Sequence, residues 1–130
     1  MGRSKAIGTR HETAVVRFLE SCGIKARRIA LSGSKDCGDV EIEGAVPCMM
    51  EVKSGKQTAN PNRLLLAEWM RQASVEARNS GKPCVLCVVR YNRRIKDAEV
   101  YFKWHGLVAR MYLDEFCSFI KYKSNIRKIE

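Results

Sequence analysis

The sequence has no apolar run close to the roughly 18 residues that a membrane-spanning helix needs. Its first residues are polar and basic, unlike a secretory signal. Acidic residues are few, because 14 Asp and Glu stand against 24 Lys and Arg and leave a formal net charge of +10. We therefore expect an intracellular, soluble protein with a polyanionic partner. Nucleic acid fits this charge better than a membrane surface does.

Internal repeats, low-complexity segments and a shift in composition that would mark a domain boundary are also absent. A chain of 130 residues with 45% hydrophobic content can bury one adequate core. We expect a single domain over residues 1–130.

The cysteines do not form the pattern of a disulfide framework or of a complete zinc site. Without a signal peptide, reduced thiols are the natural expectation. Cys84 and Cys87 have the spacing of half a zinc site, but the surrounding PCVLCVV is typical of a buried strand. Residues three apart on a strand point to opposite faces, and no second Cys or His pair is present. We expect no zinc. The scattered cysteines are Cys22, Cys37, Cys48, Cys84, Cys87 and Cys117.

The most informative stretch is residues 38–55, GDVEIEGAVPCMMEVKSG. Charged side chains alternate with apolar ones on both sides of a turn, which predicts two half-buried strands. Asp39 and Glu51 lie almost equally far from the middle of that turn. A loop with an odd number of residues makes them cross-strand neighbours, with Cβ atoms about 5 Å apart. Lys53 projects from the same face as Glu51, so two carboxylates and an ammonium meet on one patch.

Two interpretations of this patch fit the spacing. Mg²⁺ is often held by one or two carboxylates together with water and substrate phosphate. Lys53 would then orient or deprotonate a water, or neutralise charge on a phosphate. The alternative is a solvated strand face with ordinary cross-strand pairing of Glu and Lys.

A helix is expected over residues 9–22, and Glu12 is its anomaly. Glu12 shares the edge of the apolar face that would pack on the core, where a carboxylate is costly unless it is paired or bound to metal. It can form a salt bridge with Arg10 or with an arginine of the next strand. It can also lean toward Asp39 and Glu51.

The expected elements form an α/β layer fold with a mixed sheet of about five strands and helices packed on it. A helix over residues 62–79 connects the strand that contains Glu51 to a buried strand at 84–90. This crossover lets the two strands be parallel neighbours. Gln72 on this helix can reach the carboxylate patch or stay solvated. The other expected segments are a basic arm at 1–7, a strand at 24–31, a loop at 32–38 whose hydroxyls and Lys35 can cradle a phosphate, a hairpin of 98–103 with 107–112, a short helix at 114–122 and a fraying charged tail at 123–130.

The ordered set of Glu12, Ser32-Gly33-Ser34, Gly38-Asp39 and Glu51-Val52-Lys53 resembles the PD-(D/E)XK nuclease superfamily. More narrowly, it resembles the archaeal-type Holliday-junction resolvases and their phage relatives. The resemblance extends as far as Arg90 and includes the basic arm, Gly8, and the Gln72 helix that ends at Gly81-Lys82-Pro83. The proline that the family has before the aspartate is Gly38 here.

This resemblance implies a restriction-endonuclease-like core and a nuclease of DNA recombination and repair, located in the cytoplasm with the nucleoid or, if viral, in the host cytoplasm. Asp39 and Glu51 would bind Mg²⁺ or Mn²⁺ with the Val52 carbonyl, and Glu12 would be a further ligand. Lys53 would activate the hydrolytic water. Ser32 or Ser34 would hold the scissile phosphate. A homodimer would nick two opposed strands of a four-way DNA junction, with DNA contacts from Arg3, Lys5, Arg10, Arg28, Lys35, Lys56 and Gln72.

Two other functions compete with this one. The nearer is another endonuclease of the same fold, of repair, restriction or DNA-degrading type, that acts on duplex, flap or single-stranded DNA. The second is a non-catalytic basic domain that binds nucleic acid, in which Glu51 and Lys53 merely pair on a sheet.

Overall fold

The computed structural model describes the backbone of residues 2–29 and 38–129, and the side chains of residues 8–29, 38–103 and 105–123. Within these ranges it has three α-helices, two short 3-10 helices and one sheet of six strands. The helices are α1 (Gly2–Ser21), α2 (Arg63–Ser80) and α3 (Leu113–Ile129), with η1 (Lys56–Thr58) and η2 (Ile95–Asp97). The strands are β1 (Ala26–Arg28), β2 (Val40–Ile42), β3 (Cys48–Lys53), β4 (Cys84–Val88), β5 (Glu99–Trp104) and β6 (Leu107–Tyr112).

The strands lie in the sheet in chain order, from β1 at one edge to β6 at the other. β3 and β4 are parallel, and every other neighbouring pair is antiparallel. The parallel pair is connected by α2, as the crossover argument predicted. The mixed sheet flanked by helices confirms the expected fold class, with six strands where about five were expected.

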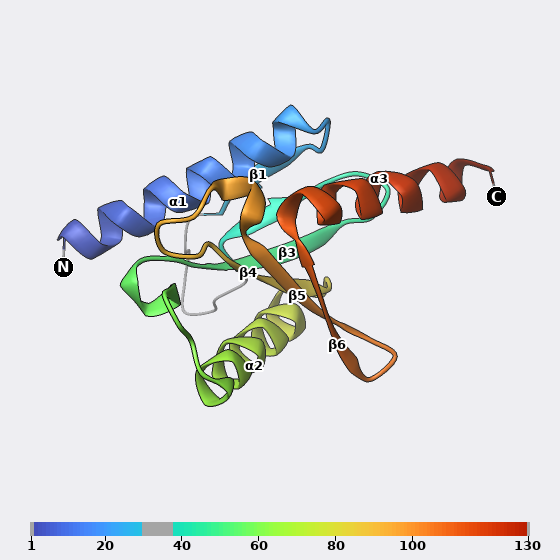
Figure 1. Ribbon diagram of the computed structural model, residues 1–130. Coiled ribbons are helices and arrows are strands. Elements are labelled where there is room, and N and C mark those ends of the chain that lie inside the picture. Colours follow the sequence, from blue (N-terminus) through green and yellow to red (C-terminus); the bar gives the residue numbers. More distant parts are fainter. Residues whose placement is uncertain (1, 30–37, 130) are drawn as a thin grey trace.

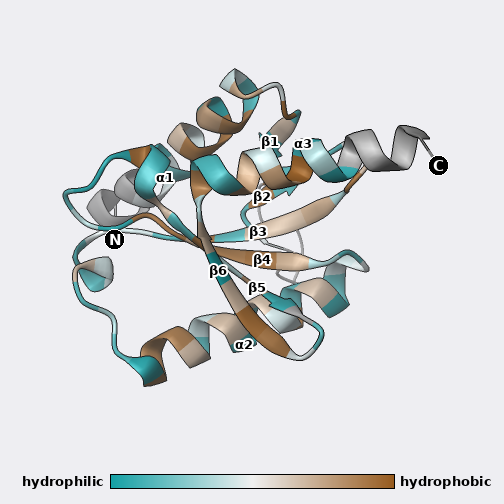
Figure 2. Cartoon of the chain, turned by 45° about the vertical axis from the view of Figure 1, so that its right-hand side comes forward, coloured by the Kyte–Doolittle hydropathy of each residue, from teal (hydrophilic) through white to brown (hydrophobic). Residues whose placement is uncertain are grey.

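The helices divide between the two faces of the sheet. Figures 1 and 2 show α1 and α3 on one face and α2 on the other. The larger core lies under α1 and α3 and includes Val15, Leu19, Met50 and Phe116. A smaller cluster lies under α2, where Trp69 packs with Leu86 and Val88. Because side chains alternate along a strand, Glu51 and Lys53 lie on the α2 side of β3.

Helix α2 begins and ends where the sequence indicates. The Asn62 side chain caps its start, because its Oδ1 accepts a hydrogen bond from the backbone N–H of Leu65 at 2.8 Å. Gly81 ends the helix in the left-handed conformation with φ 73°. The opposite faces expected for Cys84 and Cys87 are also found, since Cys87 joins the larger core and Cys84 contacts α2.

Three expected boundaries were wrong. Residues 2–7, expected as a separate basic arm, are the first turns of α1, because this stretch has no proline and includes the good helix formers Arg3, Lys5 and Ala6. α3 continues through the expected fraying tail to Ile129, since no glycine or proline follows Tyr122. The strand expected at 24–31 forms only as β1, and residues 30 and 31 lie outside the described part. No helix of the described residues is both long and apolar enough to span a bilayer.

Candidate active site

A cleft of about 1100 Å³ lies where the parallel strands β3 and β4 end. Its walls come from α1, Asp39, residues 51–57, residues 89–93 and Ile95. In Figure 1, α1 and the segments that follow β3 and β4 lie together on the left. Ligands in open α/β sheets commonly bind at the carboxyl ends of the strands. Most of the predicted site residues whose side chains are described line this one cleft: Arg10, Glu12, Asp39, Glu51, Val52, Lys53 and Lys56.

Asp39 and Glu51 face each other across the β2–β3 hairpin. The register pairs Val40 with Met50 and Ile42 with Cys48, so the next position outward places Asp39 opposite Glu51. The backbone N–H of Asp39 donates to the Met50 carbonyl at 2.9 Å. Asp39 Oδ2 accepts from the backbone N–H of Val52 at 2.8 Å. Asp39 and Glu51 are thus cross-strand neighbours, as the odd loop length predicted. The hydrogen bond from Val52 also fixes the Asp39 carboxylate against the end of β3.

Gly38, immediately before Asp39, has φ 110°. Proline holds φ near −65° and cannot adopt this conformation. A Cβ on Gly38 would also lie 3.4 Å from the Cβ of Met49. The backbone just before Asp39 therefore has a conformation that glycine adopts and proline cannot, which accounts for Gly38 at the position where the family it resembles has proline.

Glu51 is a buried carboxyl with an elevated pKa. Its residue is only 5% exposed. Burial raises the pKa of Glu51 from 4.5 to about 7; the hydrogen bond with Asp39 opposes this, the Glu76 carboxyl adds to it, and Lys53 opposes it more weakly. A carboxylate in this position is stabilised by any added positive charge, which is the property a cation site requires.

Glu76 is a functional candidate that the sequence reasoning missed. It comes from α2, is 2% exposed and lies close enough to Glu51 to affect its pKa. The Cys84 thiol donates to Glu76 Oε2 at 3.5 Å. A signal existed, because Glu76 follows Ala73 by three residues and Trp69 by seven, on the same buried face of the helix. This is the same anomaly that drew attention to Glu12.

Glu12 satisfies both interpretations offered for it. Its Oε1 lies 3.3 Å from Arg28 Nε, which is an ion pair with an arginine of the next strand. Burial raises the pKa of Glu12, the negative charge of Asp39 raises it further, and Arg28 opposes both. Glu12 therefore lies within the electrostatic field of Asp39 while a cation holds it from the other side.

The remaining predicted residues fall into three groups. Lys53 is half-buried in the cleft, and Arg10 and Lys56 are exposed at its rim. Arg28 is held by Glu12 and by a 3.5 Å hydrogen bond to Thr9 Oγ1. Gln72 does not line the cleft. Hydrogen bonds from Arg71, and to a smaller extent from Gln72, lower the pKa of Glu68. The side chains of Arg3, Lys5, Ser32, Ser34 and Lys35 lie outside the described part of the chain.

One wall of the cleft is anchored by residues that the sequence reasoning did not single out. Thr58 is fully buried, and its hydroxyl lies 2.8 Å from the Gly55 carbonyl and 2.9 Å from the Val89 carbonyl. Arg90 Nη2 donates to the Ala59 carbonyl at 2.9 Å. These contacts attach the η1 segment to the end of β4.

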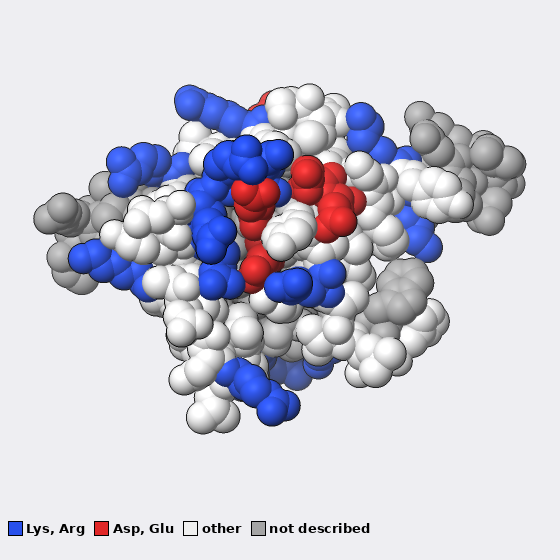
Figure 3. Space-filling view, in the orientation of Figure 1, with Lys and Arg blue, Asp and Glu red and all other residues white. Residues whose placement is uncertain are grey.

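Arg90 is itself held by a buried carboxylate. Its Nη1 lies 3.2 Å from Glu99 Oε1, and Glu99 also accepts from Arg110 at 3.3 Å and from the Tyr101 hydroxyl at 2.9 Å. Such pairing of acids with neighbouring bases is visible in Figure 3, where acidic side chains gather beside basic ones. Glu99 thus has the cationic partners that Glu51 largely lacks.

The donor set fits a hard divalent cation. No group of three or more His, Cys, Asp and Glu side chains is arranged to hold an ion among the described residues. Glu12, expected as a further ligand, is therefore not grouped with Asp39 and Glu51, the two carboxylates that face each other at the end of β3. Mg²⁺ commonly binds through one or two carboxylates and fills its other positions with water and phosphate oxygens.

Comparison with solved structures shows the fold. The chain is similar to Hjc, a Holliday junction resolvase from Archaeoglobus fulgidus, with a TM-score of 0.55 and 21% sequence identity over 81% of this chain and 88% of that chain. The chain has a resolvase-like fold. No protein-family description and no curated protein matches it significantly.

Proposed function

We propose that the chain is a Mg²⁺- or Mn²⁺-dependent DNA endonuclease of the PD-(D/E)XK kind that resolves Holliday junctions. The observation that carries the proposal is the placement of Asp39 and Glu51 opposite each other in one cleft, with Lys53 on the same strand and Glu12 beside Asp39. A solvated strand face does not account for this, because Glu51 is buried and its pKa is raised to about 7.

Each residue of the cleft has a distinct part in phosphodiester hydrolysis. Asp39 and Glu51 would hold the metal ion with the Val52 carbonyl, and Glu12 would support that set through Asp39. A bound ion supplies Lewis acidity and a more acidic water. Lys53 orients the attacking water and offsets negative charge on the phosphate. Burial of Glu51 keeps its oxygens free of competing bulk water.

The substrate class follows from charge and fold together. The net charge of +10 favours DNA. Arg10 and Lys56 place cations at the rim of the cleft, where they contact backbone phosphates without reading bases. Similarity to a structure described as a Holliday junction resolvase supports a four-way junction as the substrate. Two opposed nicks require two clefts, so we propose a homodimer.

The Asp39→Asn variant tests the metal site. We expect the rate of cleavage of a four-way DNA in Mg²⁺ to fall at least roughly 100-fold, because a carboxylate ligand is lost. Binding to the same DNA in chelator should stay unchanged or tighten, since one negative charge facing phosphate is gone. Glu43→Gln is the control, because it removes a carboxylate from the same hairpin outside the cleft. Cleavage by Asp39→Asn at the control's rate would disprove the assignment.

A comparison of DNA substrates tests whether the protein acts on four-way junctions. In Mg²⁺ the protein should cut a four-way DNA in preference to linear duplexes made from the same arms, with paired, symmetric nicks on opposed strands. Chelator should abolish both activities. Light scattering of the protein mixed with four-way DNA in chelator should show two chains per junction. Equal cutting of junction and duplex would instead identify a general endonuclease of this fold.

A further inference from the structure

A second groove, of about 480 Å³, continues the cleft along α1. Arg10, Ala14 and Ile95 line both the cleft and this groove, while Thr13, Arg17 and Phe18 line the groove alone. Its volume lies within the range of about 300–1,000 Å³ that small-ligand sites occupy. The groove therefore extends the candidate active site in one direction, away from Asp39 and Glu51.

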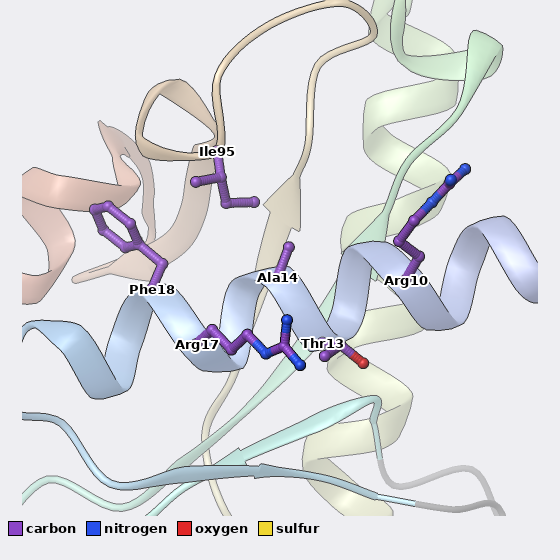
Figure 4. Close-up of a pocket in the computed structure, with 6 residues that line it drawn as sticks. All are labelled: Arg10, Thr13, Ala14, Arg17, Phe18 and Ile95. Atoms are coloured by element: carbon purple, nitrogen blue, oxygen red, sulfur yellow. The ribbon is translucent and has the colours of Figure 1, made fainter.

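The groove has an apolar floor and a cationic edge. Figure 4 shows Ile95 of η2 pointing toward α1, where Ala14 and Phe18 face it from positions one turn apart. Arg10 and Arg17 lie seven residues apart on α1, which is two turns or about 10 Å along the axis. In Figure 4 the Arg10 side chain extends toward the segment after β3, whereas the Arg17 side chain runs along α1 toward Thr13.

The two arginines of the groove are available to an anion. Within the described residues, Arg10 and Arg17 form no ion pair, whereas the nearby Arg28 and Arg94 are paired with Glu12 and Asp97. Guanidinium groups bind phosphate oxygens in a fork geometry. Two unpaired guanidiniums separated by an apolar floor suit a ligand that alternates phosphates with flat, apolar groups.

A single nucleic-acid strand has this chemistry. Its bases expose apolar faces when they are unpaired, and proteins bind such strands by combining aromatic or apolar platforms with cations along the backbone. A duplex hides its base faces and would leave the floor formed by Ala14, Phe18 and Ile95 without a partner. The continuity with the cleft gives the strand a path from the scissile position.

We propose that this groove binds an unpaired DNA strand that leaves the active-site cleft along α1, with Arg10 and Arg17 on successive phosphates and a base or sugar on the apolar floor. The inference rests on the proposed nuclease function, because the groove shares Arg10, Ala14 and Ile95 with the cleft of that function. It adds a second binding site beside the one for paired DNA, so that DNA with a single-stranded extension binds more tightly than blunt duplex.

The Arg17→Gln variant tests the groove, since Arg17 lines the groove but not the cleft. Arg78→Gln is the matched control, because Arg78 is an exposed arginine in the last turn of α2, on the other face of the sheet. Fluorescent DNA with a single-stranded extension and a blunt duplex of the same paired sequence are titrated in chelator at several salt concentrations. Thermal unfolding of each variant checks that the fold is intact.

We expect Arg17→Gln to weaken binding to the extended DNA about 3- to 10-fold, and to reduce the salt dependence by the loss of one phosphate contact, a slope change of about 0.7. Its binding to blunt duplex, and the binding of Arg78→Gln to both DNAs, should stay within about 2-fold of the unmutated protein. Equal weakening on both DNAs, or equal weakening by both variants, would overturn the proposal.

The readout separates this inference from the proposed function. Binding is measured without metal. If the protein binds as expected but never cleaves, the nuclease proposal is overturned and the groove proposal stands. If the protein cuts four-way DNA but Arg17→Gln binds the extended DNA as tightly as the unmutated protein does, only the groove proposal is overturned. Failure of the unmutated protein to bind any DNA would overturn both.

Discussion

Glu51 and Glu99 are both buried carboxylates on the α2 side of the sheet, but their neighbours differ in charge. Glu99 accepts from Arg90, Arg110 and Tyr101. Burial and the Glu76 carboxyl raise the pKa of Glu51, a hydrogen bond with Asp39 lowers it, and its one cationic neighbour, Lys53, has the smallest effect. Burying a charge without a partner is costly, so the protein holds destabilising negative charge where a metal ion would compensate it.

This difference predicts a pH-dependent effect of Glu51→Gln on the metal-free protein. The folded pKa of about 7 lies above the 4.5 of the unfolded chain, so the folded state binds more protons between these values. Its stability therefore falls as pH rises through this window. At pH 8, Glu51→Gln should raise the free energy of unfolding by about 2–3 kcal/mol, and at pH 4 by close to none.

Urea unfolding in chelator at both pH values measures this effect. Adding Mg²⁺ at pH 8 should stabilise the unmutated protein more than the variant, because the variant has lost a ligand. Glu99→Gln serves as the opposite control and should destabilise at pH 8, since it leaves Arg90 with a weakened partner. A Glu51→Gln variant that is less stable than the unmutated protein at pH 8 would show that Glu51 is already compensated.

At the scale of elements, the cleft is built by segments that follow β3 and β4 and are tied to each other. The hydroxyl of Thr58 links η1 to the end of β4, and the Lys53 carbonyl accepts from the Val89 N–H at 2.8 Å. Lys53 and Val89 are thus held in register by the parallel pair itself. The η1 segment, which carries Lys56, depends on Thr58 and on Arg90 for its position.

Thr58→Val should loosen this wall while keeping the volume of the side chain. We expect a loss of about 1–2 kcal/mol in the free energy of unfolding, because the Gly55 and Val89 carbonyls lose the one buried hydroxyl proton that they share. Hydrogen exchange of the Thr58 and Ala59 amides, which bond within η1, should accelerate. Ser118→Ala is the control, since its exposed hydroxyl makes only a 3.4 Å bond within α3. Unchanged exchange at η1 would show that Arg90 alone holds the wall.

At the scale of the whole molecule, ion pairs neutralise many charges, and the basic residues left unpaired lie partly beside the cleft. Several carboxylates are neutralised within the fold, such as Glu41, which lies 2.8 Å from Arg27 and 2.7 Å from Lys82. Arg10, Arg17 and Lys56, at the rim of the cleft and the groove, form no ion pair in the described part of the chain. Part of the excess of +10 is thereby presented beside the candidate active site, where it would steer a polyanionic ligand toward the acidic centre.

The size of the chain bears on how it would act on a junction. A folded chain of 130 residues has a radius of gyration of about 14 Å. The described residues form one cleft that gathers Asp39, Glu51 and Lys53. Two nicks on opposed strands of a junction then need two chains, and the paired-nick experiment measures this.

The sequence alone determined the features that depend on local spacing. Alternation on both sides of a short turn pairs Asp39 with Glu51, because a hairpin register follows from its loop length. Caps at Asn62 and Gly81 bound α2. The charge excess favours a polyanionic partner, which stays a prediction. Element ends were less well predicted, since α1 and α3 extend through basic segments that contain no proline.

Only the tertiary structure decided which distant segments meet. Glu76 reaches Glu51 because α2 crosses over β3 and β4, and Ile95 closes the groove on α1 across most of the chain length. These contacts depend on how helices pack on a sheet, which is set by the summed burial of both faces. No spacing within a single segment encodes that sum, so the acidic pair was readable in advance and the groove beside it was not.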